Sequence, residues 1–323
     1  MAALPVARMV ARMTGATVHI IHATTEPLSH EELFGKLRLR PPDVRGVVVE
    51  QVTDPIAEAI VREAGQRQSL FIVMTTHGKV PVRGLGPIAL AVLAQAPCPV
   101  VFVRPEAALP REGEGAPLHR ILVPLDGAPE TSAAAAPAIR FAESSGAELG
   151  LVLVATAGVA HPTQRGTLVT PRYVDQPHHE WPAWAQEFIR RTYHGLGKRP
   201  AVPIRLLPAS GKPAEQILRA ASEWKTDLIV LVWRGRLDEE HGAIIKTVLL
   251  SAPCPILVLR APKTAGNAGE GGVPPAGGNA ASRPDANRQL PSSFCPFTCD
   301  YGPSLGNSVH LEHRPLALRR SEG

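Results

Sequence analysis

A nine-residue pattern occurs twice in this chain and constrains its fold more than any other feature. Residues 96–104 read APCPVVFVR, and residues 252–260 read APCPILVLR. An apolar run precedes each copy, LFIVM at 70–74 and LIVLV at 228–232. Upstream of both runs, a proline opens a segment whose apolar residues recur at helical spacing. Blocks that agree in order and spacing predict two related domains in tandem.

The second copy, which we place at residues 118–262, alternates strand-like and helix-like segments. It opens with RILVPL at 120–125, followed by Asp126 and Gly127, which is typical of a buried parallel strand and its exit turn. Further strands are expected at 148–155, 204–207, 228–232 and 255–259, and helices at 131–145, 184–196, 213–223 and 242–250. This alternation predicts a doubly wound α/β domain.

The first copy, residues 1–105, is less complete. It starts directly in a helix at 4–13 and continues with a strand at 17–22. No counterpart of RILVPLDG precedes that helix. Residues 106–117 are rich in Pro, Gly and Glu and are expected to be a linker between the two domains.

The chain ends in a tail, residues 263–323, that has no counterpart in the first copy. Its stretch 266–290 contains six glycines, three prolines and no aromatic residue, so we expect the tail to be disordered and dispensable for folding. Four residues of the two types that most often bind zinc lie near its end: Cys295, Cys299, His310 and His313. Their spacing approaches that of a zinc finger but misses on the His–His gap, and no ββα hydrophobic pattern surrounds them. We therefore expect no metal site.

Composition excludes several classes of protein. Hydrophobic residues make up 44% of the 323 and charged residues 20%, so a packed core can form. With 34 basic and 29 acidic residues, the net charge of +5 is too balanced to indicate a nucleic-acid partner. Four cysteines do not make a disulfide scaffold, and no apolar stretch of about 18 residues predicts a membrane span. We expect a cytoplasmic protein without a membrane or nucleic-acid partner.

The second copy resembles the universal stress protein family in four blocks: ILVPLDG, GKPAEQI, DLIVL and APCPILVLR. The likeness covers about 118–261 and, less one strand, 1–105. It implies a five-stranded parallel sheet in the order 3-2-1-4-5, in which ligands bind where the order reverses, between strands 1 and 4. Strand 1 is then the central strand that the first copy lacks. A start codon upstream of Met1 would supply it; otherwise that domain should be unstable alone, or another strand should fill the gap.

The resemblance also implies where a nucleotide would bind. Nucleotide-binding members carry an aspartate after strand 1 and, after strand 4, G-x-x-G, about nine residues and G-[S/T] opening a helix. The corresponding candidate binding residues are Asp126, Gly127, Val154, Ala155, Val232, Gly235 and Gly242. Val232 occupies the position of the first glycine of this pattern, and Ala243 occupies the position of its serine or threonine. Three acids at 238–240 would repel a triphosphate. We therefore expect no cofactor; ATP or another adenine nucleotide is the alternative.

The remaining polar candidates have simpler interpretations. Asp126 has no identifiable partner acid, base or nucleophile, so a turn or helix-cap role competes with a binding role. Cys98 and Cys254 lie at strand starts and are expected to be small buried hydrophobes. His77 precedes Gly78 in the first copy's loop, where one glycine and the hydroxyl are again missing, and is expected to be a solvated loop residue.

The repeat and the resemblance together predict two universal-stress-like domains in tandem. The resemblance implies a binding role in stress response or regulation, and we expect no enzymatic activity. The alternative is a nucleotide switch that binds ATP and hydrolyses it slowly. The last strands of the two copies, 100–104 and 256–260, are apolar and lie at sheet edges, which invites pairing. Because family members commonly dimerise through this strand, the resemblance implies an antiparallel pairing and an intramolecular pseudo-dimer.

Overall fold

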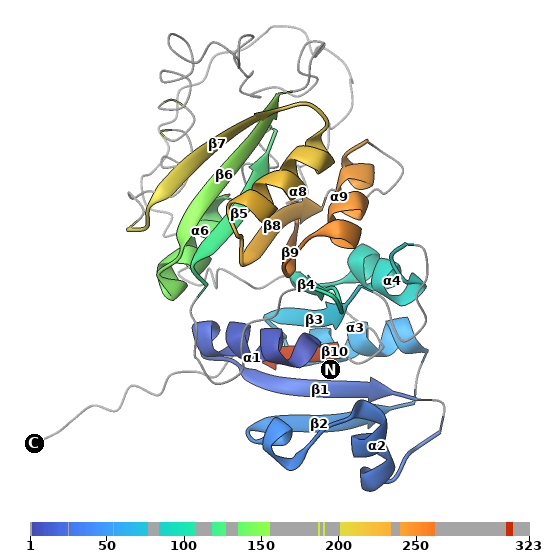
Figure 1. The fold of residues 1–323 in the computed structure, drawn as a ribbon. Coiled ribbons are helices and arrows are strands. Elements are labelled where there is room, and N and C mark those ends of the chain that lie inside the picture. Colours follow the sequence, from blue (N-terminus) through green and yellow to red (C-terminus); the bar gives the residue numbers. More distant parts are fainter. Residues whose placement is uncertain are drawn as a thin grey trace, which may run out of the picture.

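The strands of both sequence copies share a single sheet. The computed structural model describes residues 2–24, 26–53, 55–76, 84–107, 118–126, 135–155, 187, 190, 201–233, 240–261 and 308–312. Ten strands pair in the order β2-β1-β10-β3-β4-β9-β8-β5-β6-β7 (Figure 1). Helices cover both faces of this sheet. Within the described ranges, none of the helices is long and apolar enough to cross a membrane.

The second half has the predicted topology. Its strands are β5 (Arg120–Leu125), β6 (Glu148–Ala155), β7 (Ile204–Ser210), β8 (Leu228–Trp233) and β9 (Ile256–Arg260). Its described helices are α6 (Ala135–Ser145), α8 (Pro213–Glu223) and α9 (Glu240–Ser251). All neighbouring pairs are parallel, and β7-β6-β5-β8-β9 is the expected order 3-2-1-4-5. Of the helix expected at 184–196, only Glu187 and Arg190 lie within the described residues.

The first half contains the expected elements and others that the sequence analysis missed, among them a helix at 30–37 and a strand at 47–52. Its elements are α1 (Ala3–Thr14), β1 (Thr17–Ala23), α2 (His30–Leu37), the 3-10 helix η1 (Pro41–Val44), β2 (Val47–Val52), α3 (Ile56–Gln66), β3 (Phe71–Thr75), α4 (Pro87–Gln95) and β4 (Val100–Val103). The missed helix α2 begins at a capping box, in which Ser29 and Glu32 each bond the other's backbone N–H. The missed strand β2 is a half-exposed edge strand without a clear apolar alternation.

The central position of the first half is occupied by a strand from the other end of the chain. Strand β10 (Ser308–Glu312) lies between β1 and β3 and runs antiparallel to both. The expected disorder of the tail is therefore wrong for these five residues. Of the outcomes left open for the missing strand, the structure shows the one in which another strand fills the gap. The physical reason is that unpaired buried backbone groups of β1 and β3 would cost about 1–3 kcal/mol each. The sheet is completed with residues 308–312, and the rest of 263–323 lies outside the described residues.

The two halves are joined by the antiparallel strand pairing that the sequence predicts. Its register pairs Val100 with Val258, Val101 with Leu257 and Phe102 with Ile256. Val101 and Leu257 are the same position of the repeated pattern. An approximate two-fold axis therefore passes through this central pair and relates one half of the sheet to the other.

Hydrogen bonds of two arginines follow the same approximate symmetry. Arg104 Nη1 donates to the carbonyl of Ala252 at 2.9 Å. Arg260, the equivalent residue of the second copy, donates to the carbonyl of Ala96 at 3.4 Å and also to the carbonyl of Ala94. Each arginine thus binds the loop that precedes the opposite half's last strand.

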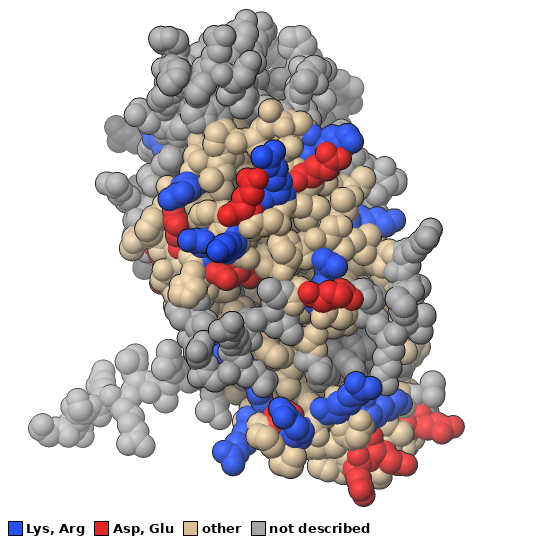
Figure 2. Space-filling view, in the orientation of Figure 1, with Lys and Arg blue, Asp and Glu red and all other residues tan. Residues whose placement is uncertain are grey.

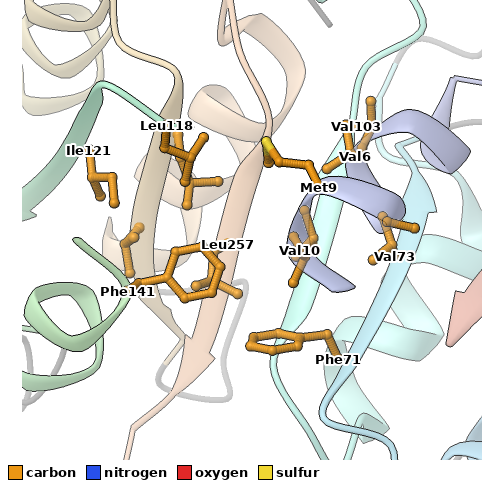
Figure 3. Packing of buried hydrophobic residues seen from close by; sticks show 14 of the residues in the cluster. Val6, Met9, Val10, Phe71, Val73, Val103, Leu118, Ile121, Phe141 and Leu257 are labelled. Carbon is orange, nitrogen blue, oxygen red and sulfur yellow. The ribbon is translucent and has the colours of Figure 1, made fainter. Parts of the chain in front are cut away.

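The hydrophobic core is continuous across the junction. One cluster of buried residues covers the sheet face under α1 and α6 and includes Met9, Leu257 and Phe141 (Figure 3). The Phe71 ring of the first half meets the Phe141 ring of the second half edge-on, with ring centroids 6.0 Å apart. The opposite face, under α3, α4, α8 and α9, holds a second cluster that also spans both halves. The halves therefore pack as one body.

Candidate functional site

The reversal of strand order in the second half creates the site that the topology favours. Strand β5 pairs with β6 along its full length, from Arg120 to Leu125. On its other side, its ladder with β8 holds the pairs of Ile121 with Leu228 and Leu122 with Ile229, both near the start of the strands. The carboxyl ends of β5 and β8 are therefore not held together by that ladder. This is the crevice position at which open α/β sheets bind ligands.

The structure places four of the predicted site residues at the carboxyl edge of the sheet. Asp126 follows β5 directly and is exposed. Val154 is half-buried and Ala155 is the last residue of β6, beside β5. Gly242 is buried in the first turn of α9, which follows β8. Gly127 and Gly235 lie outside the described residues.

Val232 belongs to the sheet and not to the loop that was expected to begin there. Strand β8 runs one residue further than expected, to Trp233, because the apolar run continues through both residues. Val232 is paired with Leu259 of β9 and is 6% exposed, within the cluster under α1 and α6. The Val232 side chain packs in the core and does not face a bound phosphate. Val232 could affect phosphate binding only through its backbone, which is held in the sheet by its pairing with β9.

The equivalent edge of the first half is built differently. Thr76 is buried after β3; its N–H donates to the carbonyl of Val103 at 3.1 Å, and its carbonyl accepts from Gly86 at 3.0 Å. Gly86 is the N-cap residue of α4. The central strand contributes its amino end here, since Ser308 of β10 pairs with Ile21 near the carboxyl end of β1. Among the residues that the structure describes, no carboxyl end of a strand followed by an aspartate lies in this slot. His77 and Gly78 lie outside the described residues.

A separate cavity of about 520 Å³ lies between α8 and the strands β6 and β7. Val152, Leu207 and Pro208 contribute to its apolar wall, together with Trp224 at the end of α8. On its rim, Arg219 Nε donates to Glu223 at 2.7 Å. Nearby on the same helix, Lys212 Nζ lies 3.0 Å from Glu215. Figure 2 shows basic and acidic side chains intermixed on the face of the molecule that it presents. Sequence reasoning missed the cavity because it depends on how α8 sits on the sheet.

The buried cysteines are unsuited to chemistry. Cys98 and Cys254 are 5% and 3% exposed, in agreement with their predicted role as buried hydrophobes. Burial raises the pKa of the Cys254 thiol to about 12, and the Asp227 carboxylate adds to the rise. A thiol held neutral in this way is a poor nucleophile. Among the described residues, no group of three or more His, Cys, Asp or Glu side chains is placed to hold a metal ion.

Comparisons with known proteins point to one family. The sequence profile of the universal stress protein family matches residues 21–104 and 117–260. A universal stress protein of Mycobacterium tuberculosis is 26% identical over 231 residues, which are 69% of this chain and 71% of that protein. One of Methanocaldococcus jannaschii is 27% identical over 158 residues, covering 47% of this chain and 88% of its own.

Solved structures agree on the fold. A functionally unknown protein of Pseudomonas aeruginosa superposes with a TM-score of 0.54 at 18% identity, covering 80% of this chain and 87% of its own. A universal stress protein of Archaeoglobus fulgidus reaches 0.52 at 16% identity, covering 80% and 92%. Each likeness extends over most of both chains and therefore includes both halves of the sheet.

Proposed function

Because the chain belongs to the universal stress protein family, we propose that it is a regulatory binding protein of the stress response without catalysis of its own. The observation that carries this proposal is the second half's crevice, where exposed Asp126 and the first turn of α9 follow neighbouring strands. A helix N-terminus offers free N–H groups, and a carboxylate accepts hydrogen bonds from hydroxyls or amines. This combination suits recognition of a small polar ligand better than bond cleavage.

The ligand class follows from the residues around that helix start. Ala243, in the first turn of α9, has no hydroxyl to donate to a phosphate. Three acids at 238–240 precede or open the helix and oppose the binding of a triphosphate. We therefore propose a nucleoside or a nucleoside monophosphate as the ligand, in preference to ATP. An ATP-binding and slowly hydrolysing switch is the alternative.

The pairing of β4 with β9 supports a second element of the proposal. In this view, the two halves form an intramolecular pseudo-dimer, in which the first half takes the place of a partner subunit. The reciprocal bonds of Arg104 and Arg260 to opposite halves support this view. We place the protein in the cytoplasm, with no nucleic-acid or membrane partner.

A thermal-shift titration tests the ligand class. A ligand that binds the folded state alone raises the melting temperature by mass action, so AMP or adenosine should give a saturable shift. Asp126→Ala should abolish that shift. Glu215→Ala, which removes one exposed acid on α8, is the matched control and should leave it unchanged.

The alternative has a distinct signature. A clear shift at micromolar Mg-ATP that is lost in Asp126→Ala, together with release of inorganic phosphate, would show that the chain is a nucleotide switch. No shift with AMP, adenosine or ATP would overturn the proposed crevice ligand.

A further inference from the structure

The first half is completed by a segment that the family topology does not use. In the second half, β5 precedes its neighbours in the chain and runs parallel to both of them. In the first half, the equivalent slot holds β10, which comes last in the chain and runs antiparallel to both neighbours. A slot between two parallel strands presents backbone donors and acceptors on both sides. It can therefore pair with an inserted strand of either direction.

The register shows that β10 occupies the same rows as β5. Leu311 pairs with Val18 on one side and with Phe71 on the other. In the second half, Ile121 pairs with Leu149 and Leu228. Gly15 and Gly146 both end a helix in the left-handed conformation two residues before strands β1 and β6, which makes Val18 and Leu149 equivalent.

The next row agrees. His310 pairs with His19 and Ile72, as Leu122 pairs with Gly150 and Ile229. Ile72 and Ile229 are equivalent because each donates its N–H to the carbonyl of the proline before the last strand, at 3.1 Å in both halves. The strands β10 and β5, which run in opposite directions and have unrelated sequences, thus occupy equivalent positions between equivalent neighbouring strands.

The surroundings of the slot are formed by the body of the protein. Phe71, Ile72 and Val73 on one side are fully buried, as is Ile20 on the other. Helix α1 packs against β10 and against β3. The two strands that flank the slot, β1 and β3, and the helix α1 that covers one face of it all lie within residues 3–75. The segment that fills the slot contributes to none of them.

We propose that the slot between β1 and β3 is a strand-acceptor site, which binds an extended five-residue segment through main-chain hydrogen bonds, and that residues 308–312 of this chain are its ligand. This mode is strand addition, except that the added strand has a neighbour on both sides. Because main-chain bonds supply the binding, the site requires an uninterrupted row of N–H groups more than a particular sequence. This inference does not depend on the proposed crevice ligand.

A cleavable form of the whole chain tests the proposal directly. A site for a specific protease is inserted after residue 285, and the purified, folded protein is cut once. If the slot binds its strand by itself, the released fragment, residues 286–323, co-elutes with the body in gel filtration. A labelled peptide of residues 304–316 added in excess should then replace it and become bound. A fragment that separates from the body immediately after cleavage would overturn the proposal.

A point variant supplies the matched control. His310→Pro removes an N–H at the row that pairs on both sides, and its ring disfavours a central strand. In the cut protein, the 304–316 peptide carrying His310→Pro should compete at least tenfold less well than the unchanged peptide. Equal competition by both peptides would show that the tail does not bind as a strand.

Amide hydrogen exchange of the uncut chain shows which strands lose protection when β10 cannot pair. With His310→Pro in the full chain, amides of β1 and β3 should lose protection, whereas those of β6 and β7 should keep it. The unchanged 304–316 peptide should restore the protection of β1 and β3. Unaltered protection in β1 and β3 would contradict the assignment, and β6 and β7 report whether the variant chain has folded.

Discussion

The contact between Gly150 and Trp224 provides a sharp test of how α8 is seated on the sheet. Gly150 lies inside β6, where it pairs with Leu122 of β5 and Arg205 of β7, so its backbone cannot move away. A Cβ at this position would collide with Cζ3 of the Trp224 ring and would lie 2.7 Å from Cη2. Arg120 holds the Trp224 backbone, because its Nη1 donates to the Trp224 carbonyl at 2.9 Å, and its guanidinium carbon lies over the ring, 6.0 Å from the ring centroid.

Gly150→Ala should therefore destabilise the protein. Forcing a methyl group into a packed site costs about 1–3 kcal/mol. Replacing glycine by alanine within a strand returns about 0.5–1 kcal/mol through lower backbone entropy in the unfolded chain. We expect a net loss of about 1–2 kcal/mol in the free energy of unfolding, measured by urea denaturation.

Two further variants isolate the cause. Gly35→Ala makes the same substitution in α2, where an added Cβ meets nothing within 4 Å, and should be neutral or stabilising. In a Trp224→Ala background, Gly150→Ala should lose its penalty and become stabilising. If Gly150→Ala is as stable as the natural chain, or keeps its full penalty without the tryptophan, the reasoning is refuted.

Three other predictions concern the Cys254 thiol, the Asp227 carboxylate and the two arginines at the junction of the halves. In a variant that retains Cys254 as its one cysteine, alkylation of the thiol at pH 8 should require unfolding, and rapid alkylation of the folded chain would contradict this prediction. Because the pKa of the thiol in the folded chain, about 12, exceeds its ordinary value of 9.0, the free energy of unfolding should fall as pH rises from 9 towards 12. Asp227→Ala should cost about 1–3 kcal/mol in urea denaturation, because its Oδ2 accepts two backbone N–H groups at the start of β5, and Asp227→Asn should retain more of the stability. Arg104→Met and Arg260→Met should each lower the unfolding free energy by about 1 kcal/mol, with the larger effect at Arg104, which is half-buried whereas Arg260 is exposed; no effect at either would argue against the reciprocal clamp.

Much of the fold could be predicted because turn residues and helix-start prolines lie at the ends of the apolar runs. RILVPL followed by Asp126, and the proline at 213, fixed the bounds of β5 and the start of α8. The pairing of β4 and β9 followed from the repeat and an apolar edge. The end of β8 was misplaced by one residue because a tryptophan extends a strand as readily as a valine does.

The remaining features could not be predicted because they depend on distant partners. The segment SVHLE at 308–312 has no strand pattern strong enough to stand out, and it becomes a strand because β1 and β3 offer unpaired backbone. At the candidate site, the sequence identified exposed Asp126 and the turn at Gly242. It misassigned Val232, whose side chain is buried by packing against elements far away in the chain.

The position of β10 also sets when the protein can fold. During synthesis, β4 is complete at Val103, but the strand that belongs between β1 and β3 begins at Ser308. At about 5–20 residues per second, roughly 10 to 40 s separate the two events. Throughout this interval, the first half of the nascent chain lacks β10, so the inner edges of the apolar strands β1 and β3 have no strand between them. Nascent chains should therefore be most exposed to aggregation and to chaperones in this half, although it is the first to be made.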